Sequence, residues 1–229
     1  MYLDKIEEAF YLYLEGVQLL QGALKTSFLD AYIENIENIN DEYQVRILDG
    51  LPDQATVAKL QTTYQKIKAI ELLPEEKRKL SQLLLLKGMQ TEPLQANHQL
   101  TPDSIGFLFV FLIEQLYPDK TKSYHLLDLT VGMGNLLLTL LTNLKQSGYQ
   151  IQATGVDNDE TLLAIASSNS QWIGAAVSLF HQDSLQDLLV DPVDMAVGDL
   201  PIGYYPIDEN AQHFMTGVTE GHSYAHHLL

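Results

Sequence analysis

The chain has no cysteine among its 229 residues, which excludes disulfide bonds, thiolate zinc ligands and cysteine nucleophiles. Basic side chains are scarce: 13 Lys and Arg stand against 30 Asp and Glu, for a net charge of −17. The longest apolar runs, such as Leu83–Leu86, are far shorter than the ~20 residues of a membrane-spanning helix. Acidic residues near the N-terminus occupy positions where a secretory signal carries positive charge. We therefore expect a cytoplasmic protein with no membrane segment.

The charge is unevenly distributed along the chain. Residues 1–97 hold 15 acidic and 10 basic side chains, and residues 98–229 hold 15 acidic and only 3 basic ones. A nucleic-acid-binding domain normally carries a basic face, so the second part attracts a phosphate backbone poorly. A hydrophobic fraction of 46% nevertheless supports a packed core, in one or two domains.

The first 95 residues have the apolar spacing of three and four residues that is typical of amphipathic helices. Ser27, with Asp30 three residues later, resembles a capping box, and Pro74 followed by two glutamates is typical of a helix start. No polar cluster here has the spacing of a catalytic site. We expect an all-α domain over residues 1–95, which serves as a lid or as a module for homodimerisation.

Beyond residue 95, short apolar segments alternate with helical patterns. Thr101 followed by Pro102 predicts a helix N-cap and first helical residue. Strands are predicted at 124–129, 152–157, 177–181 and 193–198, and helices at 136–144 and 160–168. This order predicts a parallel sheet with right-handed crossovers, and therefore an α/β domain over residues 96–229.

An acidic residue closes or follows each predicted strand: Asp128, Asp157, Asp183 and Asp199. Ligands of open parallel sheets bind outside the carboxyl ends of the strands, where these four side chains would share one rim. A single acid there would mean little. Four in succession, with a glycine turn after the first, indicate a binding site.

The glycine turn after the first strand admits two interpretations. Gly132 and Gly134 could begin the dinucleotide fingerprint G-x-G-x-x-G, but Leu137 stands at its third glycine. Asp128 lies four residues before the turn, where it would repel a phosphate and suit a cationic ligand. S-adenosylmethionine, a nucleoside with a sulfonium and an amino group, matches these demands. A dinucleotide-dependent oxidoreductase remains the alternative.

The segment Asp128–Asn135 (DLTVGMGN) resembles the first motif of class I S-adenosylmethionine-dependent methyltransferases. It is most similar to the N6-adenine DNA methylase group, with its D-P-x-x-G-x-G-N/S pattern. His98–Ile105 resembles the additional motif of that group, in which a Thr-Pro step opens a helix before the first strand. The resemblance covers residues 95–229 and implies a Rossmann-like parallel sheet, S-adenosylmethionine as cofactor and DNA as partner.

The resemblance also assigns roles to individual residues. Asp157 would bind the ribose hydroxyls and Asp183 would face the adenine amino group. Asp199 and Pro201 stand in the catalytic D/N-P-P-Y/F motif, and Tyr204 is a candidate for stacking on a flipped base. The complete set of implied cofactor ligands is Thr101, Pro102, Asp128, Gly132, Gly134, Asn135, Asp157, Asp183 and Ser184.

The sequence departs from the family pattern in the catalytic motif and in length. Leu200 replaces the first proline and Ile202 replaces the aromatic residue. The leading hypothesis is adenine methylation in DNA, and the alternative is a catalytically impaired, methylase-like binding or regulatory protein. Four predicted strands are fewer than the seven of the class I fold, so we expect a C-terminally truncated domain.

The C-terminal histidines, His213, His222, His226 and His227, have the residue type of metal ligands. No acid is placed as a third ligand, although His222 and His226 have helical spacing. Methyl transfer from a sulfonium also requires no metal. We therefore expect no metal site.

Overall fold

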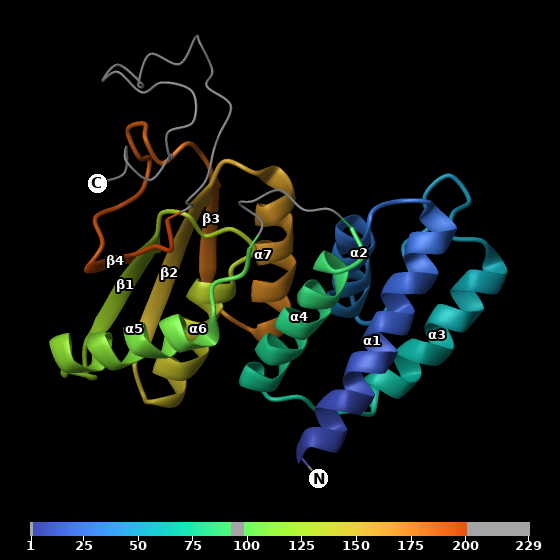
Figure 1. Ribbon diagram of the computed structural model, residues 1–229, viewed down its shortest axis with the longest axis horizontal. Coiled ribbons are helices and arrows are strands. Elements are labelled where there is room, and N and C mark those ends of the chain that lie inside the picture. The colour runs from blue at the N-terminus through green and yellow to red at the C-terminus, as the bar shows by residue number, and fades with distance from the viewer. Residues whose placement is uncertain (1, 93–98, 201–229) are drawn as a thin grey trace. The chain divides into compact units, whose positions relative to one another are not determined.

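The computed structural model describes residues 2–92 and 99–200 (Figure 1). The chain divides into two compact units: residues 1–94 with residues 164–175, and residues 95–163 with the chain from residue 176 onward. Within the described residues, no helix combines the length and apolar character needed to cross a membrane.

The helical unit is built around its first helix. Its N-terminal helices are α1 (Tyr2–Leu24), α2 (Phe28–Asn40), α3 (Gln54–Lys68) and α4 (Pro74–Met89). Helix α1 contacts each of the other three. Their shared core is apolar and fully buried, and includes Val17, Leu20, Ile36, Leu60, Ile67 and Leu80. The all-α character predicted for this part of the chain is confirmed.

Local capping explains where these helices begin. The Ser27 hydroxyl accepts the backbone N–H of Asp30 at 3.1 Å, which satisfies one of the free donors of α2. Asp53 does the same for α3, accepting the N–H of Thr56 at 2.8 Å. Pro74 is the first residue of α4. A backbone N–H at this position has no partner within the helix, so proline loses no hydrogen bond there.

Helix α7 (Glu160–Ile173) contributes residues 164–173 to the helical unit. The hydroxyl of Tyr32 donates a hydrogen bond of 2.6 Å to Oδ1 of Asn169. The rings of Tyr13 and Trp172 lie 5.1 Å apart between centroids. The predicted helix ended at residue 168, because the polar run that follows lacks the apolar spacing on which the prediction depended.

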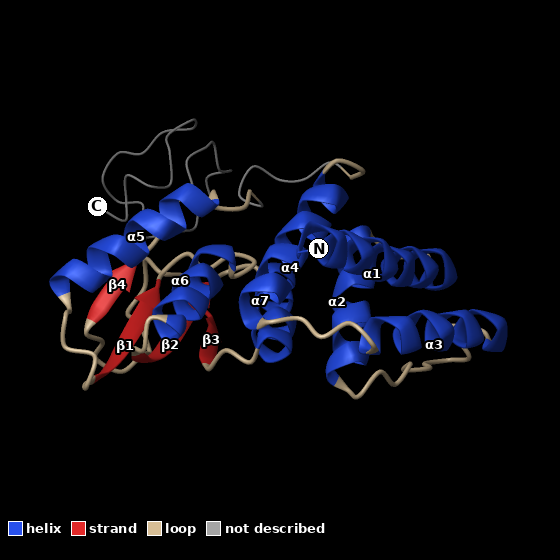
Figure 2. Cartoon of the chain, turned by 90° about the horizontal axis from the view of Figure 1, so that it is seen from below, coloured by secondary structure: helices blue, strands red, loops and turns tan. Residues whose placement is uncertain are grey.

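The second unit contains a four-stranded parallel sheet. Its strands are β1 (Ser123–Asp128), β2 (Gln150–Asp157), β3 (Val177–His181) and β4 (Met195–Val197), in the order β3-β2-β1-β4. Helix α6 (Asn135–Gln146) contacts β2, and α5 (Asp103–Leu116) packs against α6 (Figures 1 and 2). The predicted α/β fold is confirmed.

The register of the sheet places one acid at its centre. Asp128 ends β1 and is paired with Gly155 of β2 on one side and Val197 of β4 on the other. The residue two positions earlier, Leu126, is completely buried on the same face of the strand. Asp128 therefore closes an apolar strand between two neighbours that run in the same direction.

The start of α5 differs from the prediction. The helix begins at Asp103, and Pro102 is its N-cap with φ −60° and ψ 142°, so Pro102 is not the first helical residue. The carbonyl of Pro102 accordingly accepts the first helical hydrogen bonds, from the N–H of Ile105 at 3.0 Å and the N–H of Gly106 at 3.3 Å. Thr101 thus lies before the cap, and no side chain caps α5.

Candidate functional site

The turn between β1 and α6 requires its two glycines. Gly132 has φ +52° and Gly134 has φ +85°, in the left-handed region that side chains with a Cβ disfavour. The N–H of Gly134 donates to the carbonyl of Val131 at 2.8 Å and closes the turn. A Cβ at Gly132 would meet no atom within 4 Å, so the backbone conformation alone explains this glycine. Gly134 is then the N-cap of α6.

Asp157, at the end of β2, supports this turn from the neighbouring strand. Its Oδ2 accepts the N–H of Gly132 at 2.8 Å, and its Oδ1 accepts the N–H of Asp159 at 3.1 Å. A backbone bond of 3.0 Å from Val131 to the carbonyl of Val156 reinforces the contact. Burial raises the pKa of Asp157 above its ordinary value.

Asp128 is buried at the base of the turn, with only 1% of its surface exposed. Its Oδ1 accepts the N–H of Thr130 at 3.1 Å, whereas its Oδ2 has no hydrogen-bond partner in the described part of the chain. Burial, with the nearby carboxylates of Asp157 and Asp199, raises the pKa of Asp128 to about 7 against the opposing Thr130 bond. The group is thus poised between its neutral and charged forms near neutral pH.

Two hydroxyls connect the turn to the loops that follow β3 and β4. Thr130 donates to the carbonyl of Asp199 at 3.2 Å, and Ser184 donates to the carbonyl of Leu129. Ser184 was a predicted cofactor ligand, and here its hydroxyl shapes the turn. Thr130 was missed, because the motif places no constraint on its position and the residue with which it pairs is 69 positions away.

The four predicted rim acids differ in their surroundings. Asp128 lies within electrostatic reach of both Asp157 and Asp199. Asp183 follows β3, and its Oδ1 accepts the N–H of Leu185 at 2.9 Å within its own turn. The cofactor and catalytic roles of all four remain predictions.

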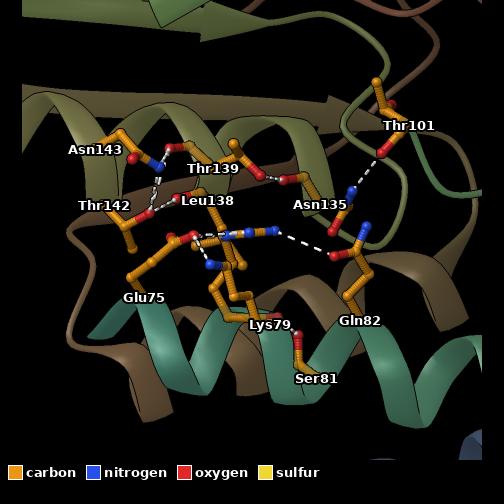
Figure 3. A network of polar contacts seen from close by, with 11 residues as sticks. Glu75, Lys79, Ser81, Gln82, Thr101, Asn135, Leu138, Thr139, Thr142 and Asn143 are labelled. Atoms are coloured by element: carbon orange, nitrogen blue, oxygen red, sulfur yellow. Dashed lines mark hydrogen bonds and ion pairs between the residues drawn. The ribbon is translucent and has the colours of Figure 1, made fainter. Parts of the chain in front are cut away.

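Asn135 connects the start of α6 to the segment before α5 (Figure 3). Its side-chain amide donates to the carbonyl of Thr101 at 2.6 Å. The carbonyl of Asn135 in turn accepts the hydroxyl of Thr139 at 2.7 Å. Two of the predicted cofactor ligands are therefore joined to each other, and the Asn135 amide positions the Thr101–Pro102 step.

Several predicted site residues lie outside the described residues: Pro201 and Tyr204 of the catalytic motif, together with Ile202 and the C-terminal histidines. Within the described ranges, residues 2–92 and 99–200, no three His, Asp or Glu side chains are grouped so that they could hold a metal ion.

The arrangement has the chemistry of a site for a cation. Acidic side chains dominate it, and a buried carboxylate oxygen without a partner attracts a positively charged group. A phosphate at the same place would be repelled by Asp157 and Asp199, and by Asp128 in its charged form. A Cβ at Gly132 would meet open space beside these acids, and the first N–H groups of α6 have no partner within the helix.

The fold is Rossmann-like and matches that of a class I methyltransferase-type structure. One similar structure comes from Listeria monocytogenes and is provisionally described as a class I S-adenosylmethionine-dependent methyltransferase. It shares 40% identity at a TM-score of 0.82, over 97% of this chain and 67% of that one. A type I restriction-modification methyltransferase subunit from Streptococcus thermophilus has a similar fold, with a TM-score of 0.51 at 16% identity, over 81% of this chain and 43% of that one.

Residues 7–89 match the YtxK N-terminal helical domain. Over 231 residues the chain is 36% identical to the uncharacterized protein YtxK of Bacillus subtilis. This match covers 100% of this chain and 68% of that relative. The chain belongs to the YtxK family.

Proposed function

We propose that this protein is an S-adenosylmethionine-dependent methyltransferase whose cofactor binds at the carboxyl ends of β1, β2 and β3. The observation that carries the proposal is the buried Oδ2 of Asp128, which has no partner at the base of the glycine turn. The cofactor, when bound, supplies a methyl group activated by a positive sulfur and brings the cation that this carboxylate lacks. The description of the 40%-identical Listeria protein supports the same cofactor.

The surrounding residues complete the proposed cofactor site. Asp157 uses one lone pair of each oxygen inside the protein, and the remaining lone pairs can accept the ribose hydroxyls. Asp183 is assigned to the adenine amino group. The left-handed turn at Gly132 and Gly134 shapes the rim beside these acids, and Asn135 holds the Thr101–Pro102 step against the same turn.

The proposed methyl acceptor is the exocyclic amine of adenine in DNA, presented as a flipped base. Asp199 would accept one N–H of that amine and orient the nitrogen toward the methyl group. The loop that carries Asp199 is connected to the glycine turn through Thr130, so acceptor and donor sites share one support. Pro201 and Tyr204 are assigned to backbone rigidity and base stacking on the sequence resemblance alone.

A cofactor-binding protein without methylase activity is the second candidate. Leu200 stands where the methylase motif has its first proline, which favours this alternative. The net charge of residues 98–229, with 15 acidic and 3 basic side chains, also opposes DNA binding.

Titration calorimetry with S-adenosylmethionine tests the shared part of both candidates. We expect saturable binding by the purified protein and a loss of at least tenfold in affinity for Asp157→Ala. The matched control is Asp191→Ala, which removes an exposed acid of the same unit and should leave the affinity unchanged. Absence of binding, or equal losses in the two variants, would refute the proposed cofactor site.

Transfer of a radiolabelled methyl group to DNA distinguishes the two candidates. Label on adenine, lost in Asp199→Ala while cofactor affinity is retained, supports the methyltransferase. Cofactor binding with no label on any nucleic acid supports the second candidate.

A further inference from the structure

The Asp128 carboxyl group has two acidic neighbours. The charged groups that face it are Asp157, at the end of β2, and Asp199, in the loop after β4. The turn on its third side, residues 129–134, contains no titratable side chain and contributes only the Thr130 N–H. Oδ2 receives no donor from any described residue. A negative charge on Asp128 is therefore poorly compensated in the free protein.

We propose that Asp128 carries a proton in the free protein and that the positive charge of the cofactor displaces this proton on binding, so that cofactor affinity depends on pH. The inference rests on the proposed function, because the cofactor supplies the charge. In the exchange the O–H bond of the Asp128 carboxyl breaks, and the proton passes to the buffer. The carboxylate that remains is neutralised by the bound cation.

Geometry and electrostatics agree on this state. A buried carboxylate with one unpaired oxygen and two acidic neighbours is more stable as the neutral acid. The pKa of about 7 leaves about nine molecules in ten protonated at pH 6, and about half at pH 7. A cation at Oδ2 reverses the balance, since it interacts favourably with the charged form alone.

Calorimetric titration of the purified protein with S-adenosylmethionine, in buffers of different ionisation enthalpy, counts the protons released. We expect about 0.9 proton per cofactor at pH 6 and about 0.5 at pH 7, following the pKa of about 7. Affinity should increase about fivefold between these two pH values by the same linkage. The range ends at pH 7, where the amino group of the cofactor is still largely charged.

Two ligands identify the responsible charge. 5′-Methylthioadenosine has the nucleoside and the sulfur but no positive charge, and should release no proton. S-adenosylhomocysteine retains the ammonium group and lacks the sulfonium. Release with both cationic ligands assigns the exchange to the ammonium, and release with S-adenosylmethionine alone assigns it to the sulfonium. Either result supports the proposal, whereas equal release with 5′-methylthioadenosine overturns it.

Two variants test the assignment to Asp128. Asp128→Asn should bind the cofactor more weakly, with neither proton release nor pH dependence. Asp199→Asn removes one of the repelling charges, so its proton release at pH 7 should be smaller than that of the unmodified protein. Unchanged release in Asp128→Asn overturns the proposal.

The outcome also separates this inference from the proposed function. Binding that is equally tight at pH 6 and pH 7, with no proton released, overturns the inference and leaves the cofactor site standing. No binding at any pH overturns both.

Discussion

The hydroxyl of Thr130 donates a hydrogen bond to the backbone carbonyl of Asp199, 3.2 Å away. Thr130→Val preserves the shape of the side chain and its backbone bond to Asp128, and removes only this hydroxyl contact. We expect the free energy of unfolding to fall by about 1 kcal/mol, the usual net value of one hydrogen bond. Methyl transfer should fall further than cofactor affinity, because the loop of Asp199 loses its support.

Urea denaturation measures the stability part of this prediction. Thr62→Val is the matched control, since its hydroxyl bonds to a carbonyl on the exposed side of α3. That change should alter stability by less than about 0.5 kcal/mol. Equal effects at the two threonines would contradict a supporting role for Thr130.

Asp128 should make the free protein less stable as the pH rises. Its pKa is about 7 in the folded protein against 3.8 for an ordinary aspartate. Between these values the folded state binds more protons than the unfolded state, so the free energy of unfolding falls as pH rises and levels off above pH 7. Asp128→Asn removes this penalty. Its free energy of unfolding should exceed that of the unmodified protein by about 4 kcal/mol at pH 8, and by little at pH 4.

Thermal or urea unfolding of both proteins from pH 4 to pH 8, without ligand, measures this difference. Asp191→Asn serves as the control, because Asp191 is exposed and its variant should follow the unmodified protein at every pH. An Asp128→Asn variant that is less stable at pH 8 would show that the carboxylate has a stabilising partner.

Gly155 lies in β2 directly beneath the glycine turn. A Cβ added there would lie 2.8 Å from Cγ2 of Val131 and 2.9 Å from Cδ2 of Leu179. Gly155→Ala should therefore cost about 1–3 kcal/mol by overpacking and displace the turn, with weaker cofactor binding. Gly22→Ala in α1 meets no atom within 4 Å and should raise stability slightly. Stability is measured by urea denaturation and affinity by calorimetry.

Tyr32→Phe tests the packing of α7 within the helical unit. The change leaves the buried Oδ1 of Asn169 without its donor, which should cost about 1–3 kcal/mol. Tyr11→Phe is the control, because Tyr11 is 61% exposed. If both changes had equally small effects on urea denaturation, the Tyr32–Asn169 bond would contribute nothing to the fold.

The fold was predictable wherever local chemistry specifies an element. Ser27, Pro74 and the glycine turn each mark a boundary through nearby backbone groups, and the strand at 177–181 matches β3 in both bounds. The second half of α7 was not predictable from periodicity. Its polar residues are buried by tertiary partners such as Tyr32, which lies 137 positions away from Asn169.

The candidate site was predictable in its residue types and only partly in their arrangement. Acids at strand ends identify the rim, because parallel strands bring their carboxyl ends together. The sequence could not show that Asp128 is buried and that one of its oxygens has no partner. It also could not show that Asn135 bonds to Thr101, since that contact joins segments 34 positions apart.

The glycine turn is held by groups from three separate segments: Asp157, Ser184 and the carbonyl of Asp199. No stretch of neighbouring residues contains all of these contacts, so a peptide of residues 128–135 would lack what fixes its shape. The turn therefore belongs to one cooperative unit with the strand ends around it. Hydrogen exchange at the Gly132 amide would then report opening of the four-stranded sheet. The site would form only when these four strands are paired.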